Sequence, residues 1–262
     1  MASDMTYGGY LALDEVLGAQ RPLSTHHDEL LFIVIHQAKE LWLKEMIHEV
    51  AFAQREIAGG RIATAQKALS RVSRIQAVMT QSWDILSTLT PADYLSFREV
   101  LGSSSGFQSA QFRELEYRLG LKDPAFLRFH PEGEPPRAAL EAALAAPSLH
   151  EAALGQLVAH GLLALEDMPA DWTATREPSE AVEAAWAKVY SDTNGWWDLY
   201  ELGEKLVDVD EALLVWRHKH VLTVERIIGR RRGTGGTEGV GYLQSTLTRR
   251  CFPELWSVRS RL

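Results

Sequence analysis

The stretch that decides the fold is LLFIVIHQAKELWLKEMIHEV, residues 30–50. Its apolar side chains recur every three to four positions, which is the spacing of one face of an α-helix. No glycine or proline lies between residues 23 and 57, so nothing in the local sequence would end a helix early. Thr25 precedes the stretch and Asp28 follows three positions later, which is the spacing of a capping box. We therefore predict a long, largely buried helix that begins near Thr25.

The same periodicity returns through most of the chain on either side of short interruptions. Further helices are predicted over residues 63–89, 92–101, 107–119, 181–206 and 208–228, with two more within 138–165 that separate at Pro147. Residues 102–106 read as a turn and residues 123–136 as a surface connection, because glycine, serine and proline replace the apolar pattern there. No segment has the pattern of a strand. We expect an all-α fold in which residues 1–262 form a single-domain helical bundle.

Composition excludes several classes of protein. Of 262 residues, 46% are hydrophobic and 24% charged, as in soluble globular domains. The 27 Lys and Arg are outnumbered by 35 Asp and Glu, and the resulting formal charge of −8 argues against nucleic-acid binding. The single cysteine, Cys251, excludes an internal disulfide and a cysteine-based zinc or iron–sulfur site. Because neither a signal peptide nor a membrane-spanning stretch is found, we expect a cytoplasmic protein without membrane partners.

Five glycines fall within residues 233–241. A phosphate-binding loop would need a preceding strand and a following Gly-Lys-Ser/Thr, and neither occurs, so we reject a nucleotide site. Glycine-rich loops also close over other ligands. The run is therefore a candidate lid for a ligand site.

Two histidines interrupt apolar helical stripes. His36 follows Phe32 by four positions, and His220 follows Trp216 by four positions. On periodicity alone, a core histidine bonded to a backbone carbonyl is the more common outcome. Two such helices also suggest a ligand cavity, and a single imidazole on an apolar face is how proteins hold haem iron. His218 lies on the far side of its helix from His220, so these two cannot hold one metal.

Arg98 follows Tyr94 by four positions within a short, otherwise apolar segment. A guanidinium beside a phenol hydroxyl is suited to bidentate capture of a carboxylate. The alternative is an exposed arginine paired with Glu99 or Glu116, since most arginines are exposed. The residues alone leave both possibilities open.

These residues belong to a set of motifs that runs along nearly the whole chain. In chain order the motifs are Tyr7-Gly-Gly-Tyr10-Leu11, His26-His27-Asp28-Glu29, Phe32, His36-Gln37, Glu40-Leu41-Trp42, Tyr94, Phe97-Arg98, Leu101-Gly102, Ser104 to Ser109, Leu206 to Val209, Trp216-Arg217, His220 and Arg232 to Gly236. With them, the sequence resembles the tryptophan 2,3-dioxygenases of the all-α indoleamine/tryptophan dioxygenase superfamily. The resemblance implies a helical bundle around a haem pocket, and oxidative cleavage by O2 of the indole C2–C3 bond of L-tryptophan to N-formylkynurenine.

The resemblance also implies which residues contact the cofactor, a haem b. His220 matches the proximal ligand of the haem iron and is the implied metal ligand. Ser105 and Trp83 match positions that line the haem.

On the substrate side, the resemblance implies five residues of this chain. His36 would be the catalytic histidine beside the indole nitrogen, and Phe32 would pack against the indole ring. Arg98 would pair with the substrate carboxylate, with Tyr94 close by. Thr234 would meet the ammonium group.

The N-terminal residues 1–22 have a separate expected role. Tyr7, Tyr10 and Leu11 match a segment that, in this family, completes the active site of a neighbouring subunit in a homotetramer. We therefore expect these three residues to reach the substrate of another copy of the chain.

The chain departs from the family pattern without losing any of these contacts. The departures are Ile35, Lys39, Arg217-His218-Lys219, Thr237-Glu238 and a shorter segment before His26. They leave room for a haem monooxygenase of the same superfamily that acts on another indole, such as an alkylindole in a biosynthetic pathway. A haem-binding sensor or carrier is a third possibility, although it has no use for an Arg–Thr pair that recognises an amino acid.

Overall fold

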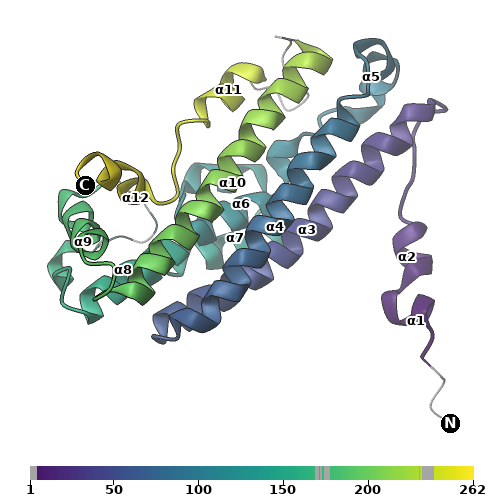
Figure 1. Cartoon of the computed structure of the whole chain (residues 1–262). Coiled ribbons are helices and arrows are strands. Elements are labelled where there is room, and N and C mark those ends of the chain that lie inside the picture. Colours follow the sequence, from purple (N-terminus) through teal and green to yellow (C-terminus); the bar gives the residue numbers. More distant parts are fainter. Residues whose placement is uncertain (1–4, 169–170, 172, 174–177, 230, 232–238) are drawn as a thin grey trace.

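A layer of three long helices organises the chain. The computed structural model describes residues 5–168, 171, 173, 178–229, 231 and 239–262. In the layer, α4 (Ile62–Leu86) lies between α3 (His27–Ala58) and α10 (Trp197–Ile228) (Figure 1). Their facing sides bury apolar residues completely, as at Val50 and Leu69. Every regular element of the described residues is helical, so the prediction of an all-α fold is confirmed.

Shorter helices surround this layer. They are α5 (Pro91–Phe97), α6 (Ala110–Leu119), α7 (Pro135–Ala145), α8 (Leu149–Ala159), α9 (Glu180–Ser191), α11 (Val240–Ser245) and α12 (Pro253–Ser257). Short 3₁₀-helices are η1 (Arg98–Leu101), η2 (Gly106–Gln108), η3 (Pro124–Phe129), η4 (Leu165–Asp167) and η5 (Val258–Ser260). In Figure 1, α5 lies at one end of the layer, α9 and α12 lie at the other, and α6 and α7 lie behind it. None of the described helices is apolar over a length that could cross a membrane.

The start of α3 differs from the prediction. Its N-cap is His26, whose side chain makes no capping hydrogen bond, so the capping box predicted at Thr25 is wrong. Instead, the carboxylate of Glu29 accepts hydrogen bonds from the backbone N–H groups of Leu23 (2.7 Å) and Ser24 (2.7 Å). The longer glutamate side chain reaches back past the first turn, and thus ties the incoming chain to the helix.

The predicted helices are confirmed within a few residues, with one boundary corrected. Helices predicted over 181–206 and 208–228 instead break at residues 192–196, between α9 and α10. There the Oδ1 atom of Asp192 accepts a hydrogen bond from the backbone N–H of Gly195 (3.0 Å). Asp and Asn favour turns through such local bonds, and glycine favours them through its backbone freedom. The apolar periodicity on both sides of this turn concealed it.

The connection predicted at residues 123–136 is partly regular and partly buried. It contains η3, and α7 begins within it at Pro135, where a proline suits the first helical turn. Phe126 is 8% exposed. The guanidinium carbon of Arg113 lies 3.8 Å from the centroid of its ring. The segment is therefore part of the wall around the core.

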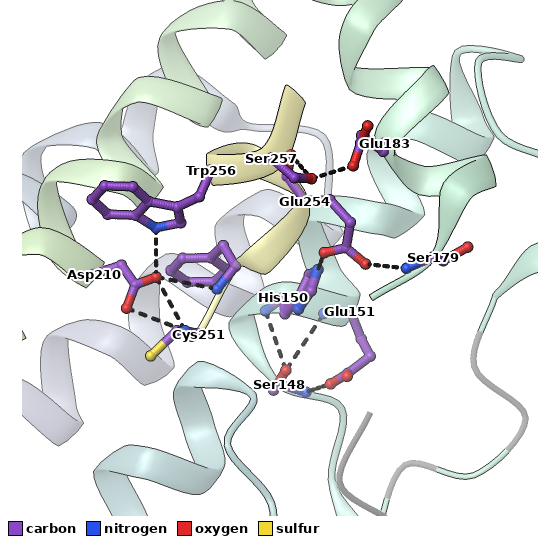
Figure 2. Close-up of polar contacts among 11 residues, drawn as sticks. Ser148, His150, Glu151, Ser179, Glu183, Asp210, Cys251, Glu254, Trp256 and Ser257 are labelled. Carbon is purple, nitrogen blue, oxygen red and sulfur yellow. Dashed lines mark hydrogen bonds and ion pairs between the residues drawn. The ribbon is translucent and has the colours of Figure 1, made fainter. Parts of the chain in front are cut away.

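Buried carboxylates anchor the C-terminal segment at the end of the bundle away from α5 (Figure 2). Asp210 of α10 accepts hydrogen bonds from the backbone N–H of Cys251 (3.1 Å) and from Nε1 of Trp256 (2.9 Å). Glu254 of α12 faces Nε2 of His150 on α8 at 3.4 Å. Both carboxylates are completely buried. They hold the chain end against α8 and α10, and thereby close this end of the bundle.

The N-terminal helices α1 (Tyr7–Leu11) and α2 (Leu13–Leu17) project away from the bundle (Figure 1). Neither contains a buried residue. Tyr7 and Tyr10 are 78% and 75% exposed. Helices this short are not stable by themselves in water, so the segment needs another surface to pack on.

Candidate functional site

A cavity of about 630 Å³ lies where α3, α4 and α10 meet α5 and the segment leading into α6. Its volume is typical of small-molecule and cofactor sites. Predicted site residues that line it are Phe32, His36, Trp83, Tyr94, Arg98, Ser105 and His220. The structure therefore brings together residues that the sequence places on separate helices.

His36 lies on the α3 wall of the cavity. Its Nδ1 atom is 2.7 Å from the carbonyl oxygen of Phe32, so Nδ1 carries the proton and donates it. Burial lowers the pKa of His36 to about 4, with a smaller contribution from the charge of Lys39. The Phe32 ring lies 4.2 Å from the imidazole and 6.0 Å from the Tyr94 ring. His36 is thus neutral, and its Nε2 atom is available to accept a hydrogen bond.

His220 lies on the α10 wall. Its ring stacks on that of Trp83, with 4.4 Å between centroids and 11° between planes. The ring of Trp216 is 5.2 Å away. Burial, followed by the charges of Lys39 and His36, lowers the pKa of His220 to about 3. The imidazole is therefore in the neutral form that binds metals.

Tyr94 and Arg98 come from α5 and the turn that follows it. The hydroxyl of Thr90 accepts a hydrogen bond from the backbone N–H of Asp93 (3.3 Å), and the Asp93 carboxylate accepts one from the Thr90 N–H (2.9 Å). This capping box starts a helix whose next turns present Tyr94 and Arg98 to the cavity. Burial raises the pKa of Tyr94, and Arg98 partly offsets this through its charge and a hydrogen bond. Glu116, one alternative partner for Arg98, is held by other arginines.

A buried ion-pair network forms another part of the wall. Glu116 of α6 pairs with Arg113 (2.5 Å) and with Arg217 of α10 (2.7 Å). Burial opposes ionisation of Glu116, but the two arginines keep its pKa below the ordinary value. Arg217 also donates to the carbonyl oxygens of Thr246 (3.4 Å) and Arg249 (3.0 Å). The sequence shows the spacing of Arg113 and Glu116 on one helix, but it gives no sign that Arg217, 101 positions after Glu116, completes the network.

Lys39, which in the sequence stands out only as a departure from the family pattern, lines the same cavity. It is 6% exposed, and among the described residues its Nζ atom has no hydrogen-bond partner. Nζ lies 2.9 Å from the centroid of the Trp83 ring. Burial lowers the pKa of Lys39 to about 7. The adjacent Glu40 is engaged elsewhere, because its carboxylate accepts hydrogen bonds from Ser109 (2.6 Å) and Gln111 (2.8 Å).

Four predicted substrate residues are not part of this cavity as described. Thr234 lies outside the described residues. Tyr7, Tyr10 and Leu11 lie on α1, and none of them lines the cavity of its own chain. The structure therefore does not test the contact predicted for Thr234, and it keeps Tyr7, Tyr10 and Leu11 out of the cavity of their own chain.

Most of the described departures from the family pattern lie away from the cavity. Ile35 is 5% exposed and packs in the apolar core. Nδ1 of the exposed His218 donates to the carbonyl oxygen of Leu214 (2.9 Å), and Nζ of Lys219 lies 2.5 Å from a carboxylate oxygen of Asp84. Residues 237 and 238 lie outside the described residues.

The cavity residues fit a haem group. In the part of the chain that the structure describes, no cluster of three or more His, Cys, Asp and Glu side chains could hold a bare metal ion. A porphyrin brings its own nitrogen ligands, so one protein imidazole suffices. Within that same part, backbone carbonyls hold the rings of His36 and His218 by hydrogen bonds, and none holds that of His220. His220 therefore offers a neutral, uncommitted imidazole to a largely apolar space.

Comparison with known proteins points to one family. The family model described as tryptophan 2,3-dioxygenase matches residues 1–133 and 176–262. The chain is 65% identical over 263 residues to a Caulobacter vibrioides protein named tryptophan 2,3-dioxygenase, and the match covers 100% of both chains. Proteins of the same name from Bacillus cereus and Cupriavidus necator are 50% and 47% identical. Those two matches cover 99% and 100% of this chain, and 93% and 89% of the relatives.

Proposed function

The chain belongs to the tryptophan 2,3-dioxygenase family, and from this premise we propose that it uses O2 to cleave the indole C2–C3 bond of L-tryptophan, giving N-formylkynurenine. The observation that carries the proposal is a single cavity lined by His220, His36 and Arg98. These residues offer a metal ligand, a neutral hydrogen-bond acceptor and a carboxylate receptor. Haem and an amino acid with an indole side chain together require all three.

In this proposal His220 holds the iron of a haem b. Trp83 stacks on the His220 ring and fixes its orientation, and Ser105 lies on the wall of the same cavity. The bound haem would supply the activation of O2. The chain contributes an apolar enclosure that keeps water from the reacting atoms.

The residues across the cavity would orient the substrate. Arg98 pairs with the carboxylate beside Tyr94, and Thr234 takes the ammonium group. Phe32 packs against the indole ring. Nε2 of His36 accepts the indole N–H, because Nδ1 is already bonded to the carbonyl oxygen of its own helix. Holding both ends of the molecule converts binding energy into correct placement of C2 and C3.

We also propose a cytoplasmic homotetramer of single-domain subunits. The three helices of the central layer carry large apolar side chains that are 40% exposed or more: Leu30, Val34, Leu41, Trp42, Val78, Ile85, Trp197, Val215 and Leu222. Extended apolar patches on a protein surface mark interfaces. The projecting α1 and α2 likewise need a partner surface. A further copy of this chain would cover both.

A monooxygenase that acts on another indole is less well supported. The three relatives reported above are all named tryptophan 2,3-dioxygenase. Ile35, one departure that motivated the alternative, packs in the core and is not a lining residue of the cavity.

The test is incubation of the reduced, haem-loaded protein with L-tryptophan and 18O2. We expect N-formylkynurenine that carries both labelled oxygen atoms, formed without net consumption of reductant. A product with a single labelled atom, a need for added reductant in each turnover, or turnover only of indoles without the amino-acid side chain would overturn the proposal.

A further inference from the structure

Lys39 places a positive charge inside the cavity, and we propose that this charge, acting through Trp83 on His220, favours the ferrous over the ferric state of the bound haem. The inference rests on the proposed function, because it requires haem at His220. Lys39 is then a positioning residue, since it influences the iron through other side chains. It is also a departure of this chain from the family pattern.

Among the described residues, no carboxylate neutralises the charge on Lys39. The side chain is 6% exposed, and Nζ has no hydrogen-bond partner among the described residues. The acidic residues that line the described cavity are Glu40 and Glu116. Glu40 is held by a serine hydroxyl and a glutamine amide, and Glu116 is held by two arginines. The ammonium group therefore directs its field into the cavity.

One aromatic ring connects this charge to the proposed iron ligand. Nζ of Lys39 lies 2.9 Å from the centroid of the Trp83 ring, and the His220 ring stacks on Trp83 at 4.4 Å. Proximity to Lys39 disfavours a positive charge at both His220 and His36. The same field would act on a metal bound at His220.

The sign of the effect follows from charge alone. Ferric haem carries one more positive charge than ferrous haem, so a nearby fixed cation disfavours the oxidised state. Because Lys39 is buried, water screens its charge only weakly, and a unit charge one ring away then changes such an equilibrium by roughly tenfold or more. The reduced haem is the state from which O2 chemistry begins, so Lys39 would keep the resting protein ready for reaction.

The test compares the unaltered protein with Lys39→Met, which keeps the length of the side chain and removes its charge. Spectroelectrochemical titration is carried out at about pH 6, one unit below the pKa of Lys39, so that the amine is protonated. At the midpoint potential of the unaltered protein, we expect the ferrous-to-ferric ratio of Lys39→Met to fall about tenfold, which is 59 mV for one electron. Lys39→Arg should restore the ratio. Lys44→Met removes an exposed charge from the same helix and should leave the ratio unchanged.

The titrations of the Lys39 variants have outcomes that would overturn the inference. An unchanged ratio in Lys39→Met, at full haem content, overturns the inference, as does a fall that Lys39→Arg fails to reverse. If Lys39→Met does not take up haem, Lys39→Gln provides the uncharged side chain for the same titration. Failure of the proposed function is separate, because it would show as absent haem or absent turnover in the unaltered protein before any potential is compared.

Discussion

His36 and His220 face one cavity but are held in different ways, and the difference suits them to different chemistry. Nδ1 of His36 donates to the Phe32 carbonyl, which leaves Nε2 to accept a hydrogen bond from a ligand. His220 is held by stacking on Trp83, and no hydrogen bond from the described part of the chain engages its nitrogen atoms. Burial lowers the pKa values of the two rings to about 4 and about 3. Both rings therefore stay neutral near physiological pH.

Replacing His220 with alanine should abolish haem binding or change the absorption spectrum of the ferrous protein, because the implied iron ligand is lost. His218→Ala is the matched control, since His218 lies on the same helix but is exposed and bonded to its own backbone. Haem content and the ferrous absorption spectrum are measured for both proteins. An unchanged five-coordinate ferrous spectrum in His220→Ala would disprove the assignment.

Arg98→Leu should raise the KM for L-tryptophan while haem stays bound. Loss of a charge-assisted pair to a carboxylate costs roughly 2–5 kcal/mol, and the partial exposure of Arg98 places the effect near the lower end, about thirtyfold in KM. Arg74→Leu, an exposed arginine on α4, serves as the control. Steady-state kinetics with equal KM for the two variants would show that Arg98 is structural, and would favour a substrate without a carboxylate.

His36 should make the stability of the haem-free protein depend on pH. The pKa of its ring falls from 6.5 to about 4 on folding, so below about pH 6.5 the unfolded chain binds a proton that the folded chain does not. Stability is therefore lost as the pH falls. From about pH 7 to about pH 5 this group should remove roughly 1–2 kcal/mol, and His36→Asn should remove this loss. Urea unfolding at both pH values measures the effect, and identical pH dependence in the two proteins would contradict it.

At the scale of elements, two capping boxes of the same kind allow an effect on stability to be distinguished from an effect on the site. The Thr90–Asp93 box starts the helix that presents Tyr94 and Arg98 to the cavity. The Ser148–Glu151 box starts α8 at the other end of the bundle (Figure 2). Thr90→Ala should cost about 1 kcal/mol of stability and also raise the KM for tryptophan. Ser148→Ala should destabilise by a similar amount with KM unchanged. If Thr90→Ala and Ser148→Ala lose the same stability and have equal KM values, the start of α5 does not control the site.

Periodicity predicted the helices well because most of them bury one apolar face. It failed where side chains rather than apolar spacing set the ends. Glu29 takes the place of the expected cap of α3, and Asp192 with Gly195 separates α9 from α10 within a continuous apolar pattern. Both are polar interactions over a few residues. Apolar periodicity is judged over a longer stretch of sequence and therefore does not detect them.

The candidate site was predictable in part. His36 and His220 were visible as polar interruptions of apolar stripes, and the resemblance supplied the roles of Arg98 and Thr234. Lys39 was noted only as a departure, although it follows His36 by three positions and therefore shares its face of the helix. The pairing of Glu116 with Arg217 across 101 positions had no signature in the sequence. Contacts between distant helices therefore set the limit of prediction.

At the scale of the whole molecule, the single chain leaves apolar surface uncovered. Its N-terminal helices bury nothing, and its central layer leaves apolar side chains such as Ile85 (55%) and Leu222 (62%) exposed. Tyr7 and Tyr10 do not line the cavity of their own chain. Assembly would therefore both cover the layer and supply these tyrosines to a neighbour.

Removal of residues 1–11 should weaken the oligomer and lower turnover while haem remains bound, because the described walls of each cavity stay intact. Removal of residues 1–5 alone ends before α1 and is the control. Light scattering after size exclusion gives the mass, and steady-state assays give the rate.

A second experiment mixes the shortened chain, which keeps Arg98, with full-length Arg98→Leu, which keeps Tyr7 and Tyr10. If the N-terminal segment completes a neighbouring site, the mixture should be more active than either protein alone, because each chain supplies what the other lacks. A fully active monomer, or a mixture no better than its components, would show that each subunit works alone.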